Sequence, residues 1–284
     1  MEKLTSILAV VESASAGSVV LDKAVQLARA FGANVELLLT DPSLIQEFAA
    51  QCAKHQYVEV TITASAREPR ESLPRFVLRR VAERRPDLVV KAPAGAHPLR
   101  TWTLDGTDRE LVAHCPAPVL LVRMKRWGPS PRMAAAVDVS DPEAAMVARS
   151  VLQSSGFLAL GLHGNLDILY TERDSQDSVL RMERAVKLSR LVREYYVGCE
   201  RLQMFDGPPD TRLPAIVAPR QYDILVLGGI THRTTTPLRQ TLTSKLFEAT
   251  AGDVLLVKPG MRDAARYGRG LPRQEIAHHA EELV

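Results

Sequence analysis

Short apolar runs alternate with helically spaced apolar positions along the first 124 residues. Five runs have the length and composition of buried strands: TSILAVVES (5–13), NVELLLTDP (34–42), VEVTITASA (58–66), DLVVKAP (87–93) and PVLLVRM (118–124). Between these runs, apolar residues recur every three or four positions, which predicts four helices. The first helix contains Val20, Ala24 and Leu27, and Gly32 follows it as a C-terminal glycine should.

The same pattern restarts after residue 131. Its strand-like runs are RMAAAVDVS (132–140), LDILYTER (166–173), YYVGCERLQMF (195–205), YDILVLGG (222–229) and DVLLVKP (253–259). A helix is predicted over DPEAAMVARSVLQSSG (141–156). Another is predicted over about 176–193, with an apolar side formed by Val179, Met182, Val186, Leu188, Leu191 and Val192. Asp87 and Asp223 differ by 136 positions and Val122 and Val257 by 135, so the chain contains an internal duplication.

The duplication divides the chain into two domains. We expect a first domain at residues 1–124, a linker at 125–131, a second domain at 132–260 and a charged tail at 261–284 that is disordered by composition. Trp127 in the linker could pack between the domains or cap an exposed strand end. Continuous apolar strands that alternate with helices are typical of a parallel sheet covered on both faces. The predicted fold class is therefore α/β, with two tandem doubly wound five-stranded parallel-sheet domains.

Composition and charge exclude several classes of protein. Hydrophobic residues make up 46% and charged residues 24%, as in a soluble globular protein. The net charge is only +3, with 36 basic residues interleaved among 33 acidic ones, so we expect no nucleic-acid partner. The arginines of RRVAERR (79–85) indicate the solvated face of a helix rather than a phosphate-binding stripe. No leader and no membrane span are predicted, so we expect a cytoplasmic protein.

The strand ends resemble those of a known family. Three pairs of segments, one member from each half, resemble the universal stress protein family: ILAVVES and AAAVDVS, DLVV and DILVLGG, and CPAPVLLV and GDVLLVKP. The presence of two copies in one chain resembles the tandem-domain branch of that family. The resemblance covers residues 3–260 and implies an adenine nucleotide α-hydrolase-like fold. Single-domain members pair through their last strand. The resemblance therefore implies an internal pseudo-dimer in which PVLLVRM and DVLLVKP lie antiparallel, and a further homodimer stays open.

ATP-binding members of this family resemble one another in a loop after the fourth strand, which reads Gly, two residues, Gly, nine residues, Gly and then Ser or Thr. Such glycines let backbone N–H groups approach phosphates closely. The first domain departs from this pattern, with Ala92 at the first glycine, Asp105 near the last, and Glu12 in place of the aspartate that ends strand one. Its weaker candidate residues are Glu12, Gly95, Gly106 and Thr107.

The second domain keeps more of the nucleotide pattern. The resemblance implies a nucleotide or anion site formed by Asp138, Gly228, Gly229, Arg233, Thr243 and Ser244. The loop also carries His232 and Arg239, which could hold an anion without the missing glycines. The alternative is a polar surface loop that has lost its ligand.

Catalytic motifs are missing from the sequence. It contains no P-loop, no G-x-G-x-x-G, no G-x-S-x-G and no H-E-x-x-H, and His114–Cys115 is interpreted as a packing pair. We therefore expect no enzyme, no catalytic residues and no metal site. The expected function is a non-catalytic stress-response binding or regulatory protein, with an unidentified protein or small molecule as its partner and no required cofactor. The alternative is a sensor that binds ATP with magnesium in its second domain.

Overall fold

The computed structural model describes residues 1, 3–64, 70–93, 104, 106–172, 178–195, 199–229 and 242–259. In the text below, the first half is residues 1–124 and the second half is residues 132–260. The predicted C-terminal tail lies outside the described residues. The elements of the first half are β1 (Ser6–Val11), α1 (Ala14–Phe31), β2 (Asn34–Leu39), η1 (Pro42–Leu44), α2 (Ile45–Cys52), β3 (Val60–Ala64), α3 (Leu73–Arg84), β4 (Leu88–Lys91), α4 (Gly106–His114) and β5 (Val119–Leu121).

The second half follows the same order of strands and α-helices, without a counterpart of η1 among its described residues. Its elements are β6 (Arg132–Ala136), α5 (Pro142–Gly161), β7 (Asn165–Glu172), α6 (Ser178–Tyr195), β8 (Cys199–Asp206), α7 (Pro209–Arg220), β9 (Ile224–Gly228), α8 (Leu242–Ala249) and β10 (Asp253–Val257). Local signals explain several helix ends. Gly32 ends α1 with a positive φ of 67°, as its sequence predicts, and the Asp141 carboxylate accepts a hydrogen bond from the backbone N–H of Ala144 at the start of α5.

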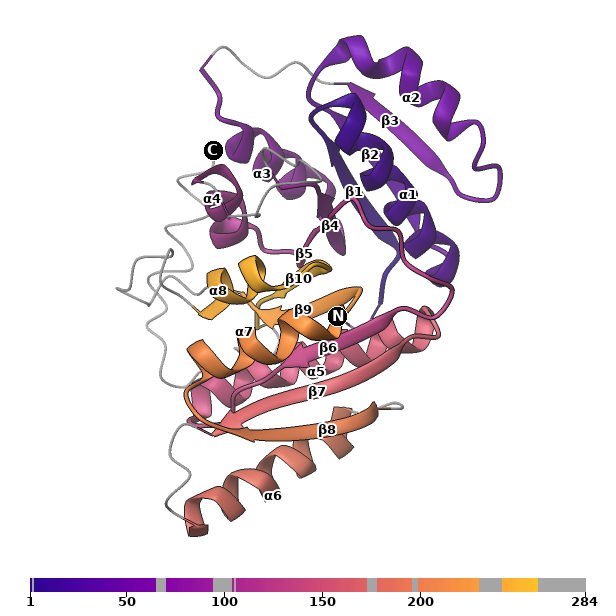
Figure 1. Cartoon of the computed structure of the whole chain (residues 1–284). Helices are drawn as coiled ribbons and strands as arrows, with labels where there is room; N and C mark the ends of the chain where they lie inside the picture. Colours follow the sequence, from indigo (N-terminus) through magenta and orange to yellow (C-terminus); the bar gives the residue numbers. More distant parts are fainter. Residues whose placement is uncertain are drawn as a thin grey trace.

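All ten strands form one sheet in the order β3-β2-β1-β4-β5-β10-β9-β6-β7-β8 (Figure 1). Each half contributes five parallel strands, and the second half repeats the order of the first in reverse. The two halves meet where β5 pairs antiparallel with β10, in a register that places Leu120 opposite Leu255. The α/β fold class is thereby confirmed, and so is the predicted antiparallel pairing of the two last strands.

Helices cover both faces of the sheet. One apolar core contains residues of α1, α2, α5 and α6, including Leu27, Phe48, Val151 and Leu188. The other core contains residues of α3, α4, α7 and α8, including Phe76, Leu111, Leu213 and Phe247. Two helices of each half thus lie on each face, as expected for strands that are apolar on both sides.

Basic residues at the ends of the two last strands cross the joint between the halves. Arg123 follows β5 and donates a hydrogen bond to the backbone oxygen of Phe247 in α8. Lys258 follows β10, and its Nζ donates to the backbone oxygens of Ala113 (2.6 Å) and Cys115 (2.9 Å) at the end of α4. A cation is favourable at a helix C-terminus because the last carbonyls there lack partners within the helix. The basic residue that follows the last strand of each half therefore binds the C-terminus of the last helix of the other half.

Trp127 packs between the halves, which decides between the two alternatives that the sequence leaves open. Its side chain is 8% exposed, and its indole N–H donates to the Asp253 carboxylate at 2.8 Å. The same carboxylate accepts from the Lys23 ammonium and from the backbone N–H of Arg123. Burial raises the pKa of Asp253 to about 6, although these three donors each favour the carboxylate. This buried cluster joins α1, the linker and β10.

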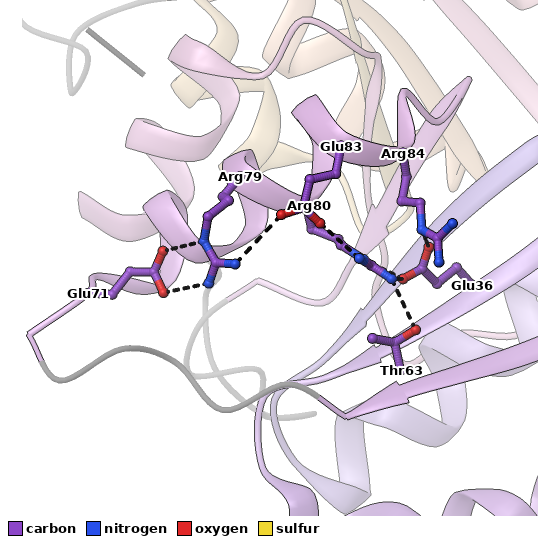
Figure 2. A network of polar contacts seen from close by, with 7 residues as sticks. All are labelled: Glu36, Thr63, Glu71, Arg79, Arg80, Glu83 and Arg84. Atoms are coloured by element: carbon purple, nitrogen blue, oxygen red, sulfur yellow. Dashed lines mark hydrogen bonds and ion pairs between the residues drawn. The ribbon is translucent and has the colours of Figure 1, made fainter. Parts of the chain in front are cut away.

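Three arginines of α3 are ion-paired with glutamates (Figure 2). Arg79 binds Glu71 at 3.0 Å, and Arg80 binds Glu36 of β2 at 2.6 Å. Arg84 also reaches Glu36, at 3.3 Å. Guanidinium groups that already have carboxylate partners on the protein are not a free phosphate-binding stripe, in agreement with the sequence-based interpretation.

Two features differ from the sequence-based expectation. The sequence pattern assigned no element to residues 207–221, where the structure has α7. This helix contains Pro214 and Pro219, which normally argue against a helix interior, and it is held instead by its buried apolar side. In α6 the predicted apolar side is wrong in part. Leu188 and Leu191 are buried, but Val179, Met182 and Val186 are exposed (62%, 64% and 63%), because the helix lies on the sheet with its other side.

Candidate functional site

A cavity of about 470 Å³ lies at the carboxyl ends of β6 and β9. These neighbouring strands belong to the same parallel sheet, but α5 lies on one face and α7 and α8 on the other. Such a topological switch point leaves a crevice that binds ligands in doubly wound folds. The cavity is lined by Ala136, Val137, Asp138, Ala144, Val147, Ala148, Val151, Thr171, Pro209, Asp210, Leu213, Leu227, Gly228, Leu242, Thr243 and Leu246.

The walls of this cavity are mostly apolar, with a few polar groups. Asp138 is exposed at the end of the β6 segment, and its Oδ1 accepts a hydrogen bond from the backbone N–H of Ser140 at 2.8 Å. Asp210 forms an ion pair with Lys245 at 2.9 Å. Thr171 and Thr243 add hydroxyl groups. Among the described lining residues there is no lysine or arginine, so this part of the cavity suits apolar rings and hydrogen-bond donors better than phosphates.

Gly228 is required by close packing at the mouth of the cavity. A Cβ atom at this position would lie 2.4 Å from Cγ1 of Val147 in α5, which is shorter than any real contact. The glycine therefore allows α5 to approach the end of β9 and shapes the cavity wall.

The structure brings together three of the six residues predicted for the second half. Asp138, Gly228 and Thr243 all line the cavity. Gly229 lies beside it, with its N–H donating to the backbone oxygen of Val257 at 2.6 Å, and Ser244 is buried in α8 with 6% exposure. Arg233 belongs to residues 230–241, which lie outside the described residues together with His232 and Arg239.

The equivalent position of the first half contains a buried lysine. Lys91, at the carboxyl end of β4, is 0% exposed. Its ammonium binds Glu12 at 2.6 Å and Asp108 of α4 at 2.7 Å, and donates to the backbone oxygen of Ala92 at 2.9 Å. These three acceptors match the three hydrogens that a lysine can donate. Burial disfavours the ammonium, but Asp108 and Glu12 outweigh it and raise the pKa of Lys91 above its usual value of 10.5.

Strand register relates this cluster to the cavity of the second half. Ile7 lies opposite Leu88 and Met133 opposite Ile224, so Glu12 corresponds to Asp138 and Lys91 to Leu227. The shift of 135 residues that superposes Val122 on Val257 also superposes Asp108 on Thr243. Asp138, Leu227 and Thr243 line the open cavity, whereas their three counterparts bind one another.

The first-half candidates of the sequence are only partly involved. Glu12 takes part in the buried cluster, while the exposed Gly106 and the half-buried Thr107 form the start of α4. Gly95 and Asp105 lie outside the described residues. Sequence reasoning missed Lys91 and Asp108. The available signal was the single charged residue inside the apolar string DLVVKAP, where the repeat has DILVLGG.

Other chemistry finds little support in the described part of the chain. Burial raises the pKa of the Cys115 thiol to about 11, which keeps the thiol protonated and unreactive, in agreement with a packing role. No group of three or more His, Cys, Asp or Glu side chains among the described residues could hold a metal ion. No helix among them has the length and apolar character needed to cross a bilayer.

Comparisons with known proteins identify the fold. No protein-family model matches the sequence, and no curated protein matches it significantly. A protein described as a universal stress protein from Pseudomonas aeruginosa UCBPP-PA14 has a TM-score of 0.77 at 20% identity, over 93% of this chain and 96% of that chain. A protein of unknown function from P. aeruginosa PAO1 gives 0.75 at 21% identity, again over 93% and 96%.

A universal stress protein from Archaeoglobus fulgidus DSM 4304 is also similar, with a TM-score of 0.63 at 14% identity, over 90% of this chain and 98% of that chain. Two of these three structural neighbours are described as universal stress proteins, as the sequence resemblance predicts, and the present chain has their fold. Identities of this size establish the fold and leave function to the site itself.

Proposed function

We propose that this chain, which has the fold of universal stress proteins, is a non-catalytic stress-response binding protein of the tandem type that holds a ligand at only one of its two switch points, the one in its second half. The observation that carries the proposal is the cavity of about 470 Å³ at the switch point between β6 and β9. Its volume falls within the range of small-molecule sites. Its apolar walls suit a ring system, and the carboxylates of Asp138 and Asp210 can accept hydrogen bonds from hydroxyl or amino groups.

The Lys91 cluster supports the assignment of a ligand to only one of the two switch points. At the first-half switch point, two carboxylates and one ammonium carry a net negative charge and bind one another. A phosphate brought to this position would be repelled, and Lys91 has no hydrogen left to donate. In this proposal the first half serves as a scaffold, and the pseudo-dimer formed through β5 and β10 holds the ligand-binding half in place.

A nucleotide sensor is the second candidate, favoured by Asp138 and Gly228 at the cavity. The described residues fit the nucleoside part of ATP better than its phosphates, because the described lining offers two carboxylates and no cation. The phosphates would have to be held by residues 230–241, whose sequence contains Arg233 and Arg239, whereas magnesium would suit the carboxylate oxygens of the described lining. When bound, such a nucleotide would supply a signal of the cell's energy state. Within the described residues, Asp138 and Thr243 would position its sugar.

Calorimetry with two probes separates the candidates. Adenosine tests the described cavity alone, and ATP with magnesium tests the cavity together with residues 230–241. Heat from ATP–magnesium at millimolar or lower concentration supports the sensor, and no heat from ATP rejects it. A sensitive phosphate-release assay with ATP tests the non-catalytic assignment, and sustained turnover would overturn it.

A matched pair of variants locates the site. L227K/T243D rebuilds the closed cluster of the first half in the second, since Asp138 already stands where Glu12 does. K91L/D108T makes the reverse change. We expect L227K/T243D to abolish binding of any ligand of this cavity and K91L/D108T to retain it. Unchanged binding by L227K/T243D would place the ligand elsewhere.

A further inference from the structure

A second hollow lies in the first half, away from the cavity between β6 and β9. It is bounded by α1, by the segment after α2 and by the linker, which runs beside α1 toward β6 (Figure 1). Its volume is about 390 Å³. It is lined by Val19, Asp22, Lys23, Val25, Gln26, Arg29, His55, Arg126 and Trp127, none of which lines the cavity of the second half. Because the linker supplies one wall, this groove exists only where the two halves are joined in one chain.

The floor of the groove is fixed by the buried cluster around Asp253. The Lys23 ammonium donates to the backbone oxygen of Arg123 at 2.8 Å and to the Asp253 carboxylate. It also lies 5.3 Å from the centre of the Trp127 ring. Trp127 is itself bound to Asp253. These side chains already have their partners, so the floor is rigid before any ligand arrives, which lowers the entropic cost of binding.

The rim of the groove carries an excess of basic groups. Arg29 Nη2 and His55 Nδ1 face each other at 3.5 Å, and Arg29 is exposed. Arg126 is 87% exposed at its side chain and lies 3.4 Å from Asp22, the one acidic side chain in the lining. The rim therefore carries two guanidinium groups and one imidazole but only one carboxylate. Exposed ion pairs such as Arg126–Asp22 are weak, so Arg126 can exchange this partner for a stronger one.

We propose that this groove binds a small molecule carrying two or more phosphate or carboxylate groups. The guanidinium groups of Arg29 and Arg126 bind such groups through paired, charge-assisted hydrogen bonds, and Gln26 and His55 add further polar groups. The volume is large enough for a molecule of the size of a tricarboxylate or a sugar phosphate. Because Arg29 belongs to α1 and Arg126 to the linker, the ligand fastens the linker to the first half.

Trp127 is a natural reporter for this site. The chain contains two tryptophans, Trp102 and Trp127, so the W102F variant leaves Trp127 as the only source of indole fluorescence. Pyrophosphate and citrate are titrated separately into this variant, with potassium chloride at matched ionic strength as the screening control. We expect a saturable, one-to-one change in fluorescence with at least one of the two anions and none with chloride. Comparing the pyrophosphate and citrate titrations distinguishes recognition of phosphate groups from recognition of carboxylate groups.

Two further variants decide the assignment. R29Q/R126Q, made in the W102F background, removes both guanidinium groups and is expected to weaken binding at least about tenfold, as the loss of a charge-assisted hydrogen bond does. The fold should survive, because both side chains are exposed or weakly paired. R193Q on α6 is the matched control and should bind as W102F does. The proposal is overturned if neither anion gives a saturable change by about 10 mM, or if R29Q/R126Q binds unchanged.

This test is independent of the proposed function, because the two sites share no lining residue. Binding of pyrophosphate that is lost in L227K/T243D but kept in R29Q/R126Q would count against the groove and for the cavity. Binding lost only in R29Q/R126Q would support the groove, whatever the cavity holds.

Discussion

Replacing Lys91 by leucine tests whether the first half is closed by a charged cluster. Leucine is the residue of the second half at the equivalent position, Leu227, so the change introduces no foreign side chain. It removes the ammonium that binds Glu12 and Asp108. Asp108 is 0% exposed and loses this cation in an environment that water does not reach, whereas the Glu12 side chain is 31% exposed and can be hydrated.

The magnitude follows from the burial of the pair. Removing one partner of a buried ion pair costs about 3–5 kcal/mol, because the other charge is left uncompensated. For a chain of this size, each kcal/mol lowers Tm by about 2–4 °C, so K91L should melt about 6–20 °C below the wild type. Replacing both partners by residues that fit is close to neutral. K91L/D108T, which copies the second half, should therefore recover most of the lost stability.

Urea unfolding followed by circular dichroism, with scanning calorimetry, measures both variants. The expected order of stability is wild type, then K91L/D108T close to it, then K91L well below. The pH dependence adds a second readout. Because the pKa of Lys91 is raised in the folded state, its contribution is fully present below pH 10.5 and is lost as the pH rises through the folded value. A loss under about 1 kcal/mol in K91L, or a double variant as unstable as K91L, would refute the cluster.

Three further predictions concern the joint, the exposed side of α6 and the cavity. Burial lowers the pKa of Lys258 to about 8 in the folded chain. Between pH 8 and 10.5, Lys258 therefore carries more protons in the unfolded chain than in the folded one, which makes the folded state more stable as the pH rises. Urea titrations of the wild type and K258M should show the stability difference shifting in favour of the wild type with increasing pH. V186S should change the unfolding free energy by under about 0.5 kcal/mol, whereas L188A should cost about 2–5 kcal/mol; equal losses would contradict the orientation of α6. G228A should cost about 1–3 kcal/mol by overpacking against Val147, and V147A/G228A should recover part of it; a thermal melt that shows no loss in G228A would contradict the close contact.

The sequence predicts the architecture well because the duplication repeats each signal. Strand-length apolar runs recur in the same order in both halves, and the basic residue after each last strand, Arg123 or Lys258, recurs with them. Knowing that such strands pair across a dimer was enough to place β5 antiparallel to β10. The reason for the two cations appears only in three dimensions, because each reaches a helix of the opposite half.

The candidate site was predicted only in part, since its state depends on contacts distant in sequence. Asp138, Gly228 and Thr243 follow from the family resemblance and do line the cavity. Whether the side chains of a switch point bind one another depends on a residue such as Lys91, whose partners Glu12 and Asp108 lie elsewhere in the chain. Periodicity likewise could not determine which apolar side of α6 faces the sheet. In α7, the two prolines argued against a helix that tertiary packing in fact stabilises.

The two halves can share one fold and still differ in function, because ligand binding depends on a few positions at the strand ends. Within the described residues, three differences between equivalent positions separate a switch point whose side chains bind one another from one whose side chains line a cavity. The comparison between the two halves is therefore an internal control, in which topology and register stay constant while the chemistry of the site changes.

Native mass spectrometry of freshly purified protein tests the central claim most directly. If the second-half cavity holds the ligand and the Lys91 cluster occupies the first-half switch point, the wild type and K91L/D108T should each retain a bound small molecule that L227K/T243D lacks. A bare wild-type chain, or a ligand that stays on L227K/T243D and leaves K91L/D108T, would contradict the account.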